Sequence, residues 1–501
     1  MAKKLPIFYN TLLLTAVNLA LRFVSTSFQV YLSGKIGAAG IGLLQLVLSV
    51  GGLAMTVGMG GIRTATMYLC AETVGQKRTD AMGWVLSGCI RYSLLLSIFT
   101  GTLLYALAPQ IAAKWIGNPD TLGAIRLLGC FLPINCLCGV MVGHFTGVNR
   151  IGTLAVVEVA EQFFTMAVTI LLISVWADQD PSRTCQAVIL GGGFGACFTV
   201  LLLLLLKRKE HNSIGKRISI RHKLFKTAVP LAIADNVKAG INTTESLLVP
   251  KRLALFPGES EPLASFGMVC GMVFPVLMLP AAILFALADL LIPELARCNA
   301  AGSKLRIRHL TERSLLLALI YGAFCGGILF LRADDLCFAL YKTTDAGNYL
   351  KWYAVLAPML YCDTIIDAIT KGLGQQQICV RNNIITSAMD VILLFILLPK
   401  YGMVGYYFSF LITHLINLIL STLLLIKLAG TIITLHRAVF SILAVTCAML
   451  VGVSLPNNYQ VLGFCSVFTG LLMLFNVIKK EDFMWLKGVL ISKHQLQILH
   501  R

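Results

Sequence analysis

Long apolar runs recur along almost the whole chain, and they constrain its fold more than any other feature. A helix of roughly 20 residues crosses the hydrocarbon core of a bilayer, and most of the runs have that length. Only 13% of the 501 residues are charged, whereas a soluble domain carries roughly 25%. We predict an all-α polytopic membrane protein with about 14 transmembrane helices of this length. The expected spans are residues 8–33, 40–66, 81–108, 121–145, 151–176, 185–206, 224–250, 263–291, 309–331, 349–370, 377–399, 402–427, 433–454 and 459–478.

Lys and Arg residues favour one set of the predicted loops. With an even number of spans, the loops on the side of both termini carry most of the 41 Lys and Arg residues. Because positively charged loops remain in the cytoplasm, we expect a multi-pass protein of the cytoplasmic (inner) membrane with both termini cytoplasmic. The net charge of +18 then follows from topology, and no nucleic-acid partner is expected.

The two halves of the chain resemble each other weakly. Pro133 precedes Gly147 by the same interval that separates Pro358 from Gly372. Two parallel lobes of six helices each form a known transporter architecture, so we predict two pseudo-symmetric lobes. The predicted parts are an N-lobe at residues 1–206, a basic cytoplasmic linker at 207–223, a C-lobe at 224–428, two additional helices at 429–478 and a cytoplasmic or interfacial tail at 479–501.

The seventh predicted span carries charged residues in its middle. Asp235, Lys238, Asn242 and Glu245 recur at helical spacing and share one face. A charge at the bilayer centre costs about 2.5–3.5 kcal/mol on insertion scales, so this face should not meet lipid. We expect it to line a hydrated, substrate-binding cavity between the lobes. The alternative is that Lys238 pairs with Asp235 or Glu245 as a structural ion pair within the helix.

The first predicted span carries a second polar stripe. Asn18, Arg22, Ser25 and Gln29 also share one helix face. Arg22 finds no acidic partner in its own helix, which favours a role in the same cavity over structural pairing.

Five further charged residues are candidates for cavity or ion sites. Arg63 follows a glycine-rich stretch near the cytoplasmic end of the second span, where it either faces the cavity mouth or extends to the headgroups. Glu158 and Glu161 in the fifth span, and Asp363 and Asp367 in the tenth, are closely spaced acid pairs. Such pairs either bind H⁺ or Na⁺ for coupling, or cap and bridge helices.

Sequence motifs for enzymes and metal sites are missing. The chain contains no G-x-x-x-x-G-K-[ST] phosphate loop, no H-E-x-x-H and no G-x-S-x-G. We therefore expect neither enzyme activity nor a bound cofactor or metal. Transport would then draw on an H⁺ or Na⁺ gradient, the membrane potential or the substrate gradient.

Three stretches resemble a known family. Residues 143–173, 224–253 and 371–405 are similar to polysaccharide flippases of the multidrug/oligosaccharidyl-lipid/polysaccharide exporter superfamily, and most similar to the stage V sporulation protein B branch, a relative of the lipid II flippase. The resemblance implies fourteen helices and alternating access. It also implies a cationic cavity: Arg22 matches an important arginine of the lipid II flippases, whereas Phe28 and Gln29 replace a second arginine and its acidic neighbour.

The resulting functional hypothesis is a flippase that moves an undecaprenyl-diphosphate-linked sugar, a precursor of peptidoglycan or polysaccharide, across the membrane. A role in spore cortex synthesis follows from the resemblance alone. Its expected partners are the lipid-linked substrate, membrane lipids and enzymes of envelope synthesis. The alternatives are a cation-coupled multidrug exporter of the same superfamily and a non-transporting scaffold for envelope synthesis.

Overall fold

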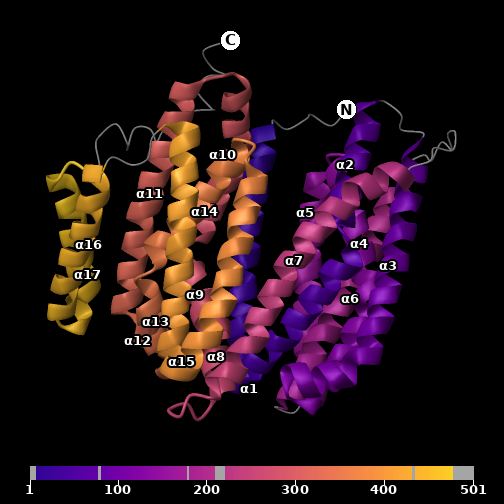
Figure 1. Cartoon of the computed structure of the whole chain (residues 1–501), viewed down its shortest axis with the longest axis horizontal. Helices are drawn as coiled ribbons and strands as arrows, with labels where there is room; N and C mark the ends of the chain where they lie inside the picture. Colours follow the sequence, from indigo (N-terminus) through magenta and orange to yellow (C-terminus); the bar gives the residue numbers. More distant parts are fainter. Residues whose placement is uncertain (1–6, 77–80, 178–179, 209–220, 431–434, 478–501) are drawn as a thin grey trace. The chain divides into compact units, whose positions relative to one another are not determined.

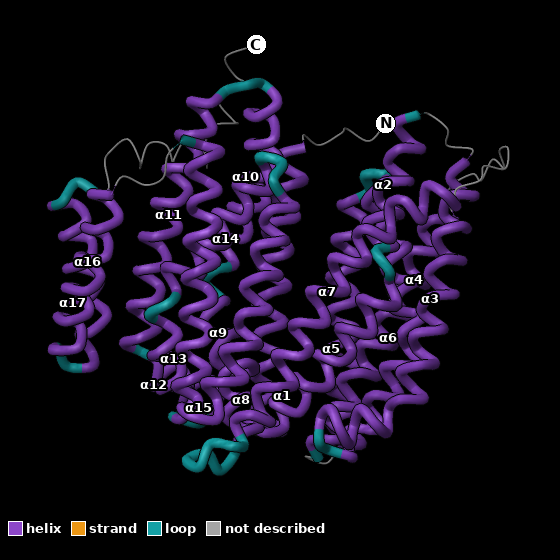
Figure 2. Tube along the Cα trace, in the orientation of Figure 1, coloured by secondary structure: helices purple, strands orange, loops and turns teal. Residues whose placement is uncertain are grey.

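The structure is a computed structural model that describes residues 7–76, 81–177, 180–208, 221–430 and 435–477. In these ranges the chain forms helices joined by short turns, without a strand (Figure 1, Figure 2). The first elements are α1 Ile7–Met59, α2 Ile62–Gly75, α3 Met82–Gln110, η2 Ile111–Ile116, η3 Pro119–Thr121, α4 Leu122–Gly147, α5 Ile151–Leu172, η4 Ile173–Ala177, α6 Pro181–Arg208, α7 Arg221–Leu253, α8 Pro262–Met268 and η5 Val269–Val273. The others are α9 Phe274–Met278, α10 Ala282–Ala300, α11 Lys304–Leu331, α12 Ala333–Tyr341, α13 Asp345–Ala354, α14 Ala357–Gly372, α15 Gln376–Ala429, α16 Leu435–Ser454 and α17 Asn457–Leu474.

Two very long helices each contain one residue outside the helical conformation. Gly37 in α1 has φ 68° and ψ −177°, and Gly402 in α15 has φ 59° and ψ −139°. Glycine adopts positive φ without the steric penalty that a β-carbon brings. Both glycines lie at or beside the breaks that the apolar pattern predicted, so each long helix corresponds to two predicted spans.

The number of candidate membrane spans agrees with the prediction without fixing it. Among the described residues, eight helices are long and apolar enough to cross a membrane, and two pairs bent by 62° and 55° raise the number to ten. Dividing α1 and α15 at their glycines adds two segments. The remaining two predicted spans fall on α7 and α17. An all-α polytopic fold is therefore confirmed, and fourteen spans remain compatible with it.

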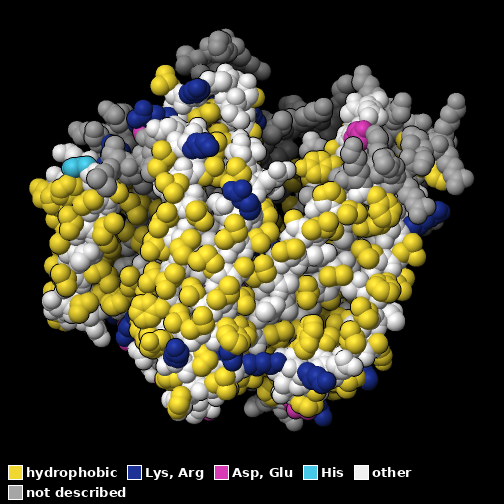
Figure 3. Space-filling view, viewed as in Figure 1, with side chains coloured by type: hydrophobic (Ala, Val, Ile, Leu, Met, Phe, Trp, Pro, Cys, Tyr) yellow, Lys and Arg dark blue, Asp and Glu magenta, His cyan; other side chains and the backbone are white. Residues whose placement is uncertain are grey.

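Apolar side chains cover most of the molecular face shown in Figure 3, and Lys and Arg side chains are sparse among them. Exposed large residues such as Leu95, Phe99, Val156 and Leu171 belong to helices that qualify as membrane spans. In a water-soluble protein such an extended apolar surface would promote association. In a bilayer it is the surface that contacts lipid tails.

Residue contacts divide the chain into two units. The first comprises Met1–Met272 with Ser387–Ser409, and its apolar core joins α2, α3, α4, α5 and α6 around residues such as Ile62, Leu86 and Phe145. The second comprises Val273–Thr386 with Phe410–Arg501, and in it Phe464 and Phe468 of α17 pack with α11 and α16. The predicted lobe boundaries stay a prediction; most of the linker and the entire tail lie outside the described residues.

The end of α4 in the first unit and the end of α14 in the second unit have matching hydrogen bonds. Each helix ends at the glycine of the repeat noticed in the sequence, Gly147 or Gly372. Three amides after each glycine donate back to the last helical turn, which satisfies carbonyls that a helix end leaves free. The matching bonds are Val148 N to His144 O and Leu373 N to Ile369 O, Asn149 N to Thr146 O and Gly374 N to Lys371 O, and Arg150 N to Phe145 O and Gln375 N to Thr370 O.

The same two glycines also mark equivalent helix contacts. A β-carbon on Gly147 would lie 2.6 Å from the Met67 carbonyl oxygen in α2, and one on Gly372 would lie 2.9 Å from the Ile292 carbonyl oxygen in α10. The same sequence offset relates the two glycines and the two carbonyls. The internal repeat is thus present in the packing of each unit.

Candidate functional site on α1, α2 and α7

A sharp backbone turn separates α1 from α2. Gly60 and Gly61 have φ of 49° and 70°, and α2 begins at Ile62. The prediction of one continuous span over residues 40–66 was wrong at this point, because a periodic apolar pattern does not register a two-residue change of backbone conformation. The turn places Arg63 in the first turn of α2 instead of near the end of a longer helix.

Helix α7 packs against α1 and α2. The buried Thr243 hydroxyl donates a hydrogen bond to the Ser49 carbonyl oxygen in α1 at 3.0 Å. This contact helps to fix the rotation of α7 about its axis. Asp235, Lys238 and Asn242 then lie along one side of the helix, and all three are exposed.

A cavity of about 330 Å³ lies where these three helices meet. Its volume falls within the range of small-molecule sites. Four of the predicted site residues line it: Arg63, Asp235, Lys238 and Asn242. The other lining residues are Met55, Thr56, Met59, Gly61, Thr64 and Ala239.

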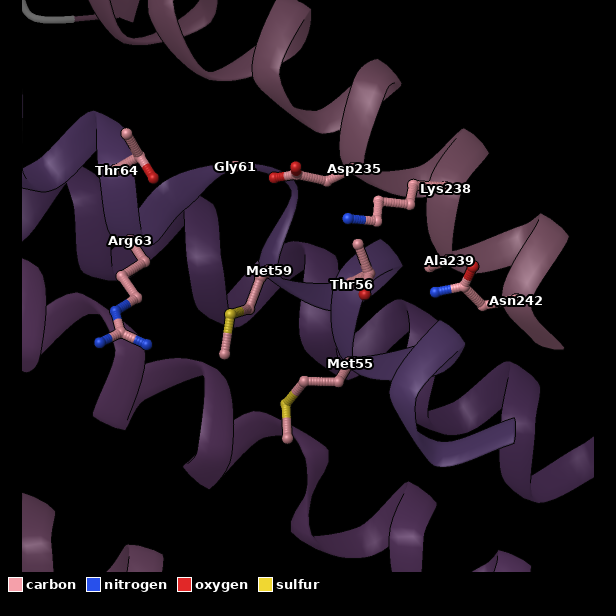
Figure 4. Close-up of a pocket in the computed structure, with 10 residues that line it drawn as sticks. All are labelled: Met55, Thr56, Met59, Gly61, Arg63, Thr64, Asp235, Lys238, Ala239 and Asn242. Carbon is pink, nitrogen blue, oxygen red and sulfur yellow. The ribbon is translucent and has the colours of Figure 1, made fainter. Parts of the chain in front are cut away.

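Charged groups of both signs face this cavity. Figure 4 shows the Asp235 carboxylate and the Lys238 ammonium extending from α7 into the same space, toward Gly61 and Thr56. In the part of the chain that the structure describes, neither side chain forms an ion pair. The alternative that Lys238 is an intrahelical structural partner of Asp235 therefore does not describe this arrangement.

Arg63 links the cavity to the acid pair on α5. Its guanidinium extends away from Asp235 and Lys238 in Figure 4. It interacts electrostatically with Glu158, and Cys138 on α4 lies close enough to interact with Arg63, Glu158 and Glu161. The pair proposed as an ion site thus has a nearby cation.

Glu245, which we expected on the face that lines the cavity, is not among the lining residues, and its described neighbour is another acid instead of Lys238. Its carboxyl group lies close enough to that of Asp390, in the same unit, for the two groups to interact electrostatically. The Ser409 hydroxyl donates to Asp390 Oδ1 at 2.6 Å, and both residues are buried. Sequence reasoning missed Asp390, although it is the lone acidic residue in the predicted span 377–399.

The polar residues of the first span are not among those that line the cavity. Gln29 donates to the Gly271 carbonyl oxygen at 3.0 Å, a contact within the first unit. Arg22 and Ser25 are exposed. The side chain of Asn18 lies outside the described residues.

The acid pair on α14 lies in the second unit and has partners there. Asn417 Nδ2 donates to both carboxylate oxygens of Asp363, at 3.1 and 2.9 Å. Asp367 accepts from the Cys379 thiol at 2.8 Å and lies 3.4 Å from the Lys371 ammonium. These contacts suit a bridge between helices, and the proposed ion role stays a prediction.

Comparisons with known proteins agree with the fold. The MatE family profile matches residues 15–171. Stage V sporulation protein B of Bacillus subtilis (strain 168) is 22% identical over 409 residues, which cover 79% of this chain and 79% of that protein.

Solved structures match over more of the chain. The lipid II flippase MurJ in an inward closed conformation superposes with a TM-score of 0.70 at 13% identity, covering 94% of this chain and 100% of that one. An inward-facing multidrug resistance MATE family transporter of the MOP superfamily gives a TM-score of 0.66 at 13% identity, covering 83% and 99%. These two matches show that the chain shares the fold of these proteins. Together, the family profile, the curated relative and the solved structures confirm the resemblance predicted from the sequence.

Proposed function

We propose that the protein is a flippase that moves an undecaprenyl-diphosphate-linked sugar across the cytoplasmic membrane by alternating access. The observation that carries this proposal is the pair of basic residues, Lys238 and Arg63, at one cavity among apolar helices. Among the described residues neither is neutralised by an ion pair. Basic groups at a cavity that form no ion pair favour an anionic ligand.

A diphosphate headgroup has the chemistry that these residues would bind. Its charge must be compensated when it leaves water. The Lys238 ammonium offers a compact charge, and the Arg63 guanidinium offers two parallel donors once it turns from Glu158 toward the cavity. The prenyl tail is apolar and can remain in the lipid, so the cavity needs to accommodate the polar headgroup alone.

One similar protein supports a lipid-linked substrate, and another supports a role in sporulation. The solved structure with a TM-score of 0.70 is that of a lipid II flippase, and the curated relative is a sporulation protein. We propose that this chain likewise transports an envelope precursor and has a role in spore cortex synthesis. We further propose that it contacts envelope-synthesis enzymes and, from the charge of its loops, that both termini are cytoplasmic.

A multidrug exporter is the second candidate, because another similar structure is a multidrug resistance transporter. A cationic drug would need net negative charge in its site. The cavity instead combines Lys238 and Arg63 with the single carboxylate of Asp235. A non-transporting scaffold is the third candidate, and for that role the cavity charges should be dispensable.

We propose that the carboxyl groups of Glu245 and Asp390 couple transport to its energy source. The two carboxyl groups interact electrostatically, and the Ser409 hydroxyl donates a hydrogen bond to Asp390 at 2.6 Å. Binding or release of a proton by this pair would change the charge of the site, which suits coupling to a gradient or to the membrane potential. Glu158 with Glu161, and Asp363 with Asp367, are the other candidate coupling pairs.

Native mass spectrometry of the purified protein would test the substrate assignment. A lipid-linked diphosphate sugar and a cationic drug are offered together to the wild type, Lys238→Ala, Arg63→Ala and two charge-matched controls at exposed positions, Lys304→Ala and Arg91→Ala. Selective retention of the diphosphate lipid, weakened in the two cavity variants and unchanged in the controls, is expected. Selective retention of the drug would favour the exporter. Lipid retention that is unchanged in both cavity variants would favour the scaffold.

A further inference from the structure

The cavity contains one acidic residue that a site for diphosphate alone does not explain. Asp235 is the single acid among the side chains that line it in the described structure. It lies one helical turn before Lys238, on the same side of α7. A carboxylate at that position opposes the binding of a phosphate group, so its presence calls for a role of its own.

The presence of Asp235 is explained neither by an ion pair with Lys238 nor by packing between helices. The two side chains form no ion pair in the described part of the chain, and Asp235 is exposed to the cavity instead of being buried between helices. While the cavity is filled with water, the carboxylate is solvated and costs little. When a headgroup displaces this water, an unpaired carboxylate loses its solvation and destabilises the complex.

We propose that Asp235 recognises a cationic amine on the sugar that adjoins the diphosphate, so that the transported headgroup is zwitterionic. This inference rests on the proposed flippase function. Lys238, with Arg63, binds the phosphates, while Asp235 accepts hydrogen bonds from the ammonium group. The acid then contributes to specificity, because a purely anionic headgroup leaves it unpaired whereas an amino-sugar headgroup neutralises it.

The spacing on α7 indicates where the amine must lie. Lys238 is the third residue after Asp235 along the helix, which corresponds to a rise of roughly 4.5 Å. The ligand ammonium must therefore be close to the phosphates, as it is on the sugar directly attached to the diphosphate. If the amine were at the far end of a long headgroup, it could not contact Asp235 while the phosphates contact Lys238 in a cavity of about 330 Å³.

A pair of matched lipids tests this inference. Polyprenyl-diphosphate-linked glucosamine and its N-acetylated form are compared for retention in native mass spectrometry, at a pH low enough to protonate the free amine. Both lipids carry the same diphosphate, and acetylation removes the positive charge. The proteins are the wild type, Asp235→Asn, which preserves side-chain shape, and Asp120→Asn, which removes an exposed carboxylate outside the cavity.

The wild type and Asp120→Asn are expected to retain the amine form about fivefold or more over the acetylated form, since a charged hydrogen bond is stronger than a neutral one. In Asp235→Asn this preference should disappear while the acetylated lipid is still retained. Equal retention of both lipids by the wild type, or a preference that survives Asp235→Asn, would overturn the inference. An equal increase in the retention of both lipids by Asp235→Asn would also overturn the inference. Retention of neither lipid by the wild type would instead contradict the proposed flippase function, and this inference with it.

Discussion

Asp235 and Lys238 lie one turn apart on α7 and extend into the same cavity, yet in the described part of the chain they do not pair with each other (Figure 4). A helical i, i+3 pair of opposite charge normally has its partner within reach. Here both groups remain available to a ligand. This separation of charges is the structural basis for assigning an ionic substrate to the cavity.

Glu158 is expected to weaken substrate binding by attracting Arg63 away from the cavity. Replacing it, as Glu158→Gln, removes that attraction and leaves the guanidinium free to reach a phosphate. Retention of a diphosphate lipid should increase severalfold, because an interaction between charges near the protein surface is worth a few kcal/mol at most. Titration by native mass spectrometry measures the change. Weaker retention in Glu158→Gln would show that the acid supports Arg63 instead of competing for it.

Glu245 and Asp390 are predicted to act as one coupling unit. Glu245→Gln and Asp390→Asn each remove one of the two interacting carboxyl groups. Flipping driven by an imposed pH gradient should therefore fall, while retention of the diphosphate lipid persists. The double variant should be no worse than the worse single one, since groups that act as a unit give non-additive effects. Gradient-driven flipping and lipid retention are measured on the same four proteins. Fully additive losses, or loss of lipid binding, would contradict a shared coupling role.

The repeated glycine contacts predict matched effects on stability in the two units. Gly147→Ala and Gly372→Ala each bring a β-carbon within 3 Å of a carbonyl oxygen on the neighbouring helix. The helices must then move apart, at a cost of typically 1–3 kcal/mol. Thermal unfolding in detergent should show a lower midpoint for both variants.

Gly83→Ala and Gly470→Ala are the controls, one in each unit, because a β-carbon at either position meets nothing within 4 Å. Alanine also has a higher helix propensity than glycine, so these variants should match or exceed the wild type. A neutral effect of Gly147→Ala or of Gly372→Ala would argue against equivalent packing in the two halves.

Much of the fold follows from local sequence, because the length of an apolar run dictates whether a helix can cross a bilayer. The breaks near Gly37 and Gly402 could be predicted from the same apolar pattern. The glycine turn after Met59 could not be predicted, because a change of φ at two residues leaves the apolar pattern intact. The polar stripe of the first predicted span illustrates the other limit. Helical periodicity predicted that Gln29 lies on a polar face, but it could not predict the hydrogen bond to the Gly271 carbonyl oxygen.

The site was predictable where its residues share one helix. The spacing of Asp235, Lys238 and Asn242 identified a common face, and all three line the cavity. Partners from distant segments were not predictable. Glu245 shares that spacing, yet its neighbour Asp390 comes from α15, far along the chain. Which helices meet is decided by packing of the whole unit, and one sequence carries no direct record of it.

Translocation in proteoliposomes tests the central claim most directly. The protein is reconstituted with a lipid-linked diphosphate sugar in one leaflet, and arrival of the sugar in the other leaflet is followed with a membrane-impermeant reagent. We expect transfer by the wild type and by Lys304→Ala well above that of empty liposomes. Transfer by Lys238→Ala should be slower by about tenfold or more, the loss expected for one charged contact to phosphate. No transfer by the wild type, or equal transfer by Lys238→Ala, would contradict a flippase that binds its headgroup in this cavity.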